Sequence, residues 1–226
     1  MHVFTSLGLV SGFMAMIAIG QQNWREAFGW LFLCFIIDGV DGTLARKFKV
    51  KEVLPYIDGK SIDYVIDFAT YAIIPAYFFY AANMVSGVWM YPCLIAILVV
   101  SAIYYGKEGM VVDNQYFVGF PVLWNAVVFY AFFVFHNRPA LTLAMIVFFS
   151  VLHFVPIRFA YPSRSKKYFF LHILASVLWF VAGAWILYLY PARTIAGEWI
   201  MILIGVYFGI IAVSDTWGNK KKSPEV

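Results

Sequence analysis

The sequence has 226 residues, of which 63% are hydrophobic, 20% are aromatic and only 12% are charged. Soluble domains carry roughly 25% charged residues, so this composition excludes an ordinary soluble protein and indicates one that lies in a bilayer. The formal net charge of +4 requires no nucleic acid partner, because basic residues in the loops of a membrane protein account for it.

Apolar stretches of about 20 residues predict the transmembrane helices in chain order. Eight such stretches lie near residues 3–20, 27–45, 61–82, 87–105, 117–135, 139–157, 168–190 and 198–216. We therefore expect an all-α fold, a polytopic membrane helix bundle of about eight spans. Residues 1–217 would form a single transmembrane domain, and residues 218–226 a polar cytoplasmic tail.

The lysine and arginine residues predict the orientation of these spans. Thirteen of the sixteen fall in loops on one side, and only Arg25, Arg138 and Arg193 fall on the other. Cytoplasmic loops carry the excess of basic residues, so both termini are expected in the cytoplasm.

Acidic residues concentrate at the facing ends of the second and third spans. Asp38 and Asp41 are three residues apart, and Asp63 and Asp67 are four apart, so each pair projects from one helix face. The loop between them returns to the same membrane surface, which lets the two pairs meet as a carboxylate box at the cytoplasmic edge. A single aspartate there would more simply be a helix cap or an interfacial residue.

Four clustered carboxylates at membrane depth repel one another unless cations neutralise them. Hard oxygen ligands of this kind suit Mg²⁺ or Mn²⁺, and two such ions can bridge a pyrophosphate. Gly42 and Gly59 permit close backbone approach, and Arg46 can pair with a phosphate. The sequence thus predicts a metal site that handles a phosphorylated substrate.

The order Asp38-x-x-Asp41-Gly42-x-x-Ala45-Arg46, followed by Gly59-x-x-x-Asp63-x-x-x-Asp67, resembles the signature of the CDP-alcohol phosphotransferase family. The resemblance implies that the four aspartates bind two divalent ions, Mn²⁺ or Mg²⁺, and that Asp67 is also the catalytic base. The expected contacts with a CDP-diacylglycerol donor are Thr5, Gly42, Ala45, Arg46 and Gly59. Arg158, near the end of the sixth span, can meet the donor phosphates or simply extend to the interface.

The loop between Arg46 and Gly59 is longer than in most of the family. This loop, the Asp38-Gly39-Val40-Asp41-Gly42 run and the eight spans resemble the bacterial members that use choline. The resemblance implies transfer of the phosphatidyl group from CDP-diacylglycerol to choline, with release of CMP. It also implies an inner membrane location, an active site on the cytoplasmic side, contact with membrane lipids and a homodimer.

A pocket for choline needs aromatic faces and a negative charge, because a quaternary ammonium has no N–H donor. Aromatic residues near span ends are more often interfacial, so the pattern leaves this pocket open. The candidates near cytoplasmic ends are Tyr64, Tyr105, Tyr116, Phe120 and Trp124, with Glu108 or Asp113 as the charge.

Two other functions compete with this interpretation. The shared motif does not distinguish choline from serine, inositol or glycerol phosphate as the acceptor. Intramembrane carboxylates also mark ion paths, so a membrane cation carrier is the nonenzymatic alternative. A carrier is expected to place polar groups near the midplane and on both sides, whereas here they gather on one side.

Overall fold

The computed structural model describes residues 2–47, 56 and 58–218, with the side chains of residues 2, 42–47 and 60 outside the description. The structure is 73% helical, which confirms the predicted helical class. The chain divides into two compact units. The first unit comprises residues 1–102 and 122–146, and the second comprises residues 103–121 and 147–226.

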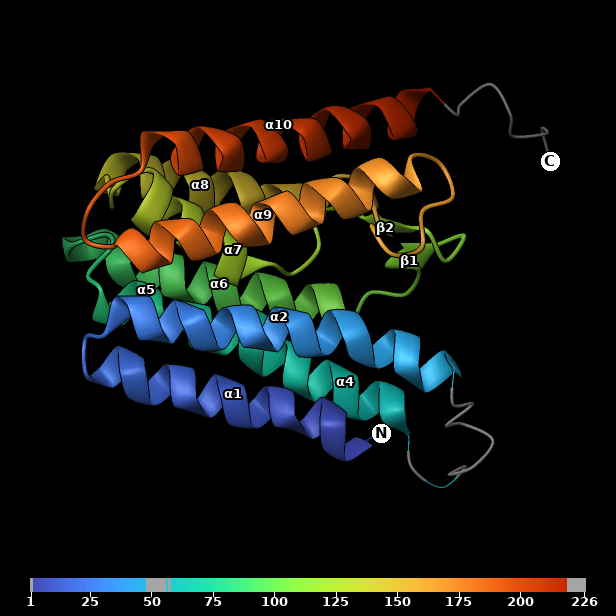
Figure 1. The fold of residues 1–226 in the computed structure, drawn as a ribbon, viewed down its shortest axis with the longest axis horizontal. Coiled ribbons are helices and arrows are strands. Elements are labelled where there is room, and N and C mark those ends of the chain that lie inside the picture. The colour runs from blue at the N-terminus through green and yellow to red at the C-terminus, as the bar shows by residue number, and fades with distance from the viewer. Residues whose placement is uncertain (1, 48–55, 57, 219–226) are drawn as a thin grey trace. The chain divides into compact units, whose positions relative to one another are not determined.

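Helices α1 (His2–Gly20) and α2 (Trp24–Lys47) form an antiparallel hairpin in the first unit. Figure 1 shows them running side by side, with α4 (Gly59–Phe68) next to them. The Ser11 hydroxyl donates to the Trp30 carbonyl at 2.8 Å, and the Cys34 thiol donates to the Gly8 carbonyl at 3.4 Å. Small side chains on α1 therefore allow the two backbones to approach closely, as is common between membrane helices.

The third predicted span is one helical stretch that changes type along its length. It begins as α4, passes through the π-helical turn η1 (Ala69–Ile73) and continues as α5 (Ile74–Ala81). Pro75 has no N–H to bond the carbonyl of Tyr71, which an α-helix would require at this point. The Thr70 hydroxyl donates to the Ile66 carbonyl at 3.0 Å. Wide turns of this kind occur frequently at functional sites.

An aromatic stripe on α2 packs against the rest of the first unit. The ring of Phe28 meets the ring of Phe78 on α5 with centroids 4.8 Å apart and that of Phe129 at 5.2 Å, both edge to face. Farther along α2, the ring of Phe35 meets the ring of Tyr71 at 5.1 Å. The stripe fixes the rotation of α2 about its axis, and hence the direction of the side chains that follow.

The remaining helical segments lie between Gly87 and Leu152. They are η2 (Gly87–Trp89), α6 (Met90–Tyr105), α7 (Trp124–Phe129), the π-helical turn η3 (Tyr130–Val134) and α8 (Pro139–Leu152). Within the first unit, the indole N–H of Trp124 donates to the Ser101 hydroxyl at 2.8 Å.

The second unit contains a feature that the sequence did not predict. Among its described residues, β1 (Val111–Val112), β2 (Tyr116–Val118) and β3 (Arg158–Ala160) form an antiparallel sheet in that order. The predicted span 117–135 therefore begins as a strand, and its helix starts only at Trp124. Likewise, the predicted span 139–157 is helical only to Leu152, because the chain turns before Pro156.

Helices α9 (Phe169–Leu189) and α10 (Ile195–Trp217) complete the second unit. The backbone N–H of Arg158 donates to the Thr216 hydroxyl at 2.8 Å, which joins β3 to the end of α10. Lys167 forms an ion pair with the buried Asp215 at 3.2 Å. This hydrogen-bonded pairing raises the pKa of Lys167 and anchors the loop before α9.

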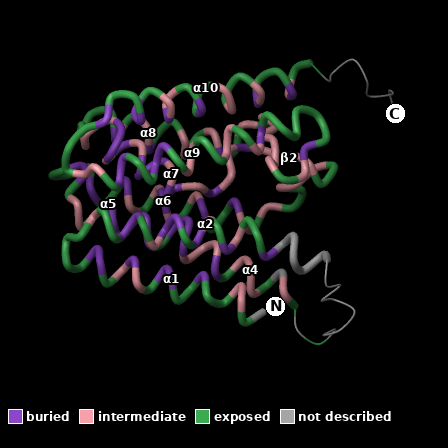
Figure 2. Tube along the Cα trace, viewed as in Figure 1, coloured by how far each residue is buried: buried purple, intermediate pink, exposed green. Residues whose placement is uncertain are grey.

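Five helices of the described chain are long and apolar enough to cross a membrane. They are Val3–Gly20, Ser61–Ala81, Gly87–Tyr105, Phe169–Leu189 and Ile195–Trp217. Figure 2 shows exposed residues recurring along α9 and α10, and these include apolar ones such as Val181 and Ile210. Exposed apolar surface of this extent fits contact with lipid, and the chain is accordingly a multi-pass membrane protein.

The close packing of Gly119 on residue 153, just after α8, leads to a prediction about the stability of the second unit. Gly119 has φ +88°, and a Cβ there would lie 2.0 Å from the His153 carbonyl oxygen. Gly109 also has positive φ, at +70°, but a Cβ there meets nothing within 4 Å. Gly109→Ala should therefore cost only the backbone strain of about 1–2 kcal/mol. Gly119→Ala should lower the free energy of unfolding by at least about 3 kcal/mol.

The measurement is thermal unfolding of the purified variants in detergent, compared with the wild-type protein. Equal midpoints for Gly119→Ala and Gly109→Ala would contradict the described packing of residue 119 on residue 153.

Candidate functional site

A pocket in the first unit brings together side chains from three helical segments. All four predicted carboxylates line it, together with Thr5, and no residue of the second unit takes part among those described. The complete lining consists of Thr5, Gly8, Cys34, Ile37, Asp38, Asp41, Asp63, Ile66, Asp67 and Thr70.

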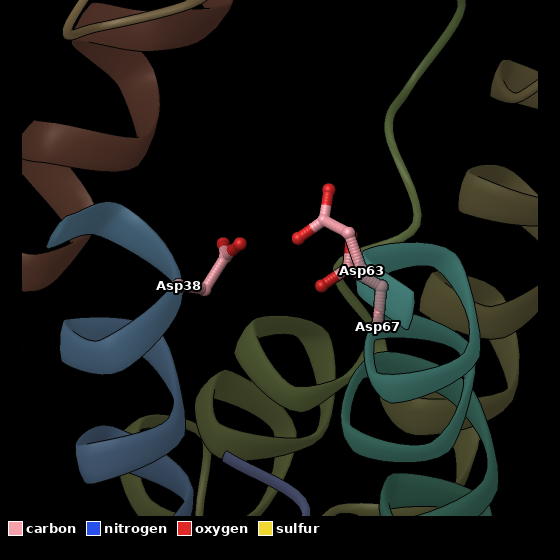
Figure 3. Close-up of side chains that lie close together, drawn as sticks. All are labelled: Asp38, Asp63 and Asp67. Atoms are coloured by element: carbon pink, nitrogen blue, oxygen red, sulfur yellow. The ribbon is translucent and has the colours of Figure 1, made fainter. Parts of the chain in front are cut away.

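Three of the carboxylates lie close enough to share a cation. Among the described residues, Asp38, Asp63 and Asp67 each offer an oxygen, and these oxygens lie within 4.8 Å of one another. Figure 3 shows Asp38 pointing from α2 toward Asp63 and Asp67 on α4. All three are half-buried, whereas Asp41, which lines the same pocket, is only 6% exposed. The four acids therefore differ in their access to solvent.

Helical spacing explains how the chain presents these acids on facing surfaces. On α2, Cys34, Asp38 and Asp41 follow one another at intervals of four and three residues, so they share one face. On the facing helix, Asp63 and Asp67 are four residues apart. The sequence predicted this convergence from the same spacing, and the structure places all four acids in one pocket.

Helix α1 supplies the uncharged wall of the pocket. Thr5 and Gly8 line it, and Gly12 continues the same face one turn farther on. A Cβ at Gly8 would lie 3.3 Å from Ile66, and one at Gly12 would lie 2.8 Å from the tip of Ile74. The two glycines therefore let α1 approach the helix that carries Asp63 and Asp67. The sequence prediction included Thr5 but missed the glycines, although their Gly-x-x-x-Gly spacing is a known packing signal.

Sequence reasoning also missed Tyr71, which contacts the site through Asp38. Its hydroxyl donates a 2.7 Å hydrogen bond to Oδ2 of Asp38. Tyr71 is only 4% exposed, and it lies four residues after Asp67 on the same helical stretch. Continuing the four-residue spacing beyond the motif would have identified this residue as a neighbour of the site.

The structure describes the side chains of only some of the residues predicted to contact the CDP-diacylglycerol donor. Gly42, Ala45 and Arg46 belong to the last turns of α2, but their side chains lie outside the described part of the structure. Gly59 is the first residue of α4. Arg158 lies in β3 of the second unit.

The two choline candidates of the first unit have different surroundings. Tyr64 is half-buried on α4, directly after Asp63. Trp124 is fully buried, and its indole N–H is committed to Ser101. This hydrogen bond ties Trp124 to α6 within the helix bundle.

The other choline candidates lie in the second unit. Phe120 packs on Phe149 with ring centroids 4.4 Å apart, and Tyr116 is buried in β2. Burial, aided by the charge of Asp215, raises the pKa of Tyr116. Tyr105 ends α6, Glu108 is exposed, and the exposed Asp113 has φ +55° beside the β1–β2 turn. A direct role for these residues in choline binding stays a prediction.

The chemistry of the pocket fits a hard divalent cation. Its charged groups are carboxylates, the oxygen donors that Mg²⁺ and Mn²⁺ prefer. They come from two different helices, so a cation held between them would also bind α2 to α4. Clustered carboxylates with few other polar groups gain most from a cation, because their mutual repulsion is otherwise uncompensated.

Comparison with known proteins identifies the family. No family model matches the chain. The phosphatidylcholine synthase of Rhizobium meliloti is 37% identical over 214 residues, which cover 93% of this chain and 87% of the relative. The phosphatidylcholine synthase of Agrobacterium fabrum is 37% identical over 224 residues, which cover 97% of this chain and 92% of the relative. The phosphatidylcholine synthase of Pseudomonas aeruginosa is 33% identical over 211 residues, which cover 93% of this chain and 86% of the relative. Because this similarity extends over most of this chain and of each relative, the chain belongs to the bacterial phosphatidylcholine synthase family of CDP-alcohol phosphotransferases.

Proposed function

We propose that this chain is a CDP-diacylglycerol–choline O-phosphatidyltransferase, which transfers the phosphatidyl group to choline and releases CMP. The observation that carries the proposal is the pocket where the four aspartates of the family motif meet. Full-length similarity to phosphatidylcholine synthases supports choline as the acceptor.

The proposal includes a membrane arrangement. Eight spans would lie in a bacterial inner membrane, with both termini and the pocket on the cytoplasmic side, where the basic loops are expected. Residues 1–217 would act as one transmembrane domain. The proposed tail, 218–226, lies almost entirely outside the described residues. A homodimer stays a prediction drawn from the family.

The metal ligands would be Asp38, Asp41, Asp63 and Asp67, holding two Mg²⁺ or Mn²⁺ ions. Bound ions would supply the positive charge that the pyrophosphate of the donor needs as CMP leaves. The carboxylates would hold these ions in a pocket that the uncharged Thr5 also lines. Arg46 would pair with a donor phosphate, as guanidinium groups do through two parallel hydrogen bonds.

Asp67 would act as the general base. Its carboxylate would accept the proton of the choline hydroxyl as the choline oxygen forms a bond to the phosphatidyl phosphorus. The bond between that phosphorus and the oxygen of CMP breaks in the same displacement. Asp67 lies one helical turn farther from the start of α4 than Asp63, and the same pocket holds both. Proton acceptance requires that Asp67 is not fully occupied by metal.

The acceptor is tested by supplying alcohols to the purified protein one at a time. With CDP-diacylglycerol and Mn²⁺, we expect CMP release to depend on choline and to yield phosphatidylcholine. Serine, inositol and glycerol phosphate should give only the background rate. CMP release with serine in the absence of choline would overturn the proposed acceptor. Mn²⁺ flux into protein-containing liposomes without lipid substrate would instead favour a cation carrier.

The base assignment predicts the effect of Asp67→Asn. A positioned general base typically raises the reaction rate by about 10²–10⁴-fold, so kcat should fall by this factor while CDP-diacylglycerol binding persists. Glu26→Gln is the matched control, because Glu26 is exposed at the opposite end of α2 and a glutamine can still accept from Trp30. Turnover by Asp67→Asn equal to that of the control would contradict the assignment.

The metal assignment predicts that chelation abolishes turnover and that added Mn²⁺ restores it. Mn²⁺ binding can be followed by the electron paramagnetic resonance signal of the free ion, without any substrate. Asp63→Asn should weaken this binding by about 10-fold or more, because it removes the negative charge of one of three converging ligands. Full activity after chelation would show that the carboxylates serve another purpose.

A further inference from the structure

Tyr71 makes a contact that the family motif does not include. Its hydroxyl donates to Oδ2 of Asp38 at 2.7 Å across 33 residues of sequence. The tyrosine is 4% exposed, so water competes little for this hydrogen bond. A hydrogen bond to a charged acceptor is stronger than one between neutral groups. The contact therefore restrains the carboxylate of Asp38 from outside the pocket.

The π-helical turn places Tyr71 where it can reach α2. In a regular α-helix, each four-residue step turns about 40° around the axis, so Tyr71 would drift away from the face of Asp63 and Asp67. The turn η1 (Ala69–Ile73) has i→i+5 bonds and thus more residues per turn, which counteracts this drift. Tyr71 lies in the middle of that turn.

A second contact holds the ring of Tyr71 against α2. The ring of Phe35 lies 5.1 Å from it at an interplanar angle of 66°. Phe35 precedes Asp38 by three residues, so both lie on the same face of α2. The aromatic contact fixes the ring, and the ring in turn fixes the direction from which the hydroxyl meets Asp38.

We propose that Tyr71 is a positioning residue that orients the carboxylate of Asp38 for metal binding. Asp38 faces the like charges of Asp63 and Asp67, which would push its side chain aside before a cation arrives. The hydroxyl of Tyr71 opposes this displacement, since it binds one oxygen of the carboxylate from a fixed position. Such outer partners of metal ligands typically affect metal affinity by about 10–100-fold. This inference rests on the proposed function, because it takes the carboxylates to be metal ligands.

Tyr71→Phe separates this role from general packing, because it removes only the hydroxyl and keeps the ring on Phe35. The matched control is Tyr80→Phe, on α5 of the same helical stretch, where Tyr80 is 49% exposed. Both variants are purified as the full chain in detergent. Mn²⁺ binding is measured without substrate, and thermal unfolding is measured after chelation of metal.

We expect Tyr71→Phe to raise the Kd for Mn²⁺ by about 10-fold and Tyr80→Phe to leave it unchanged. The Mn²⁺ concentration for half-maximal CMP release should rise by the same factor, and saturating Mn²⁺ should restore most of kcat. A purely structural role would not give this rescue by metal.

Superimposable Mn²⁺ binding curves for Tyr71→Phe and wild type would overturn the inference. A lower unfolding midpoint of the metal-free variant with unchanged Mn²⁺ affinity would also overturn it, in favour of a structural hydrogen bond. The acceptor is tested independently. If CMP release does not depend on choline, the proposed acceptor fails, while the Mn²⁺ comparison still decides the role of Tyr71.

Discussion

Repulsion between carboxylates on facing helices is the constraint that the first unit must satisfy. Two unit charges about 4 Å apart repel by about 4 kcal/mol at the effective dielectric of a protein surface. Asp38, Asp63 and Asp67 each offer an oxygen that lies within 4.8 Å of the other two. Aromatic pairs contribute about 0.5–1.5 kcal/mol each beyond their burial, so the stripe on α2 offsets only part of this repulsion, and a bound cation would neutralise the rest. The aromatic half of α2 thus holds its acidic half in place against the facing helix.

Family and geometry support different parts of the proposed reaction. Similarity to phosphatidylcholine synthases bears on the acceptor, since the described lining residues do not distinguish one small alcohol from another. The geometry bears on the metal and the base, because it brings oxygen donors from two helices together. The transferred group is anionic and the acceptor is cationic. A carboxylate pocket that carries metal ions can stabilise the first without excluding the second.

Much of the site could be predicted from sequence, because its acids follow local helical spacing. Contacts between residues far apart in the sequence could not be predicted in this way. Asp38 with Asp41, and Asp63 with Asp67, follow helical intervals, so their shared faces were predictable. Tyr71 was missed because its partner Asp38 is 33 residues away. Hydropathy also placed span 117–135 too early, because the apolar Tyr116–Val118 segment pairs as a strand before the chain reaches Trp124. Averaged hydrophobicity does not separate a buried strand from the start of a membrane helix.

The uncharged wall formed by α1 has a consequence for how this site can change. Thr5 and Gly8 bound the pocket but contribute no charge, whereas the acids all come from the other two segments. Helix α1 therefore affects the site through its packing and not through charge. A Cβ at position 8 would already lie 3.3 Å from Ile66, so a larger side chain there would press on the helix that carries Asp63 and Asp67. A substitution on α1 can thus change the spacing between the carboxylates of the two facing helices without changing any acidic residue.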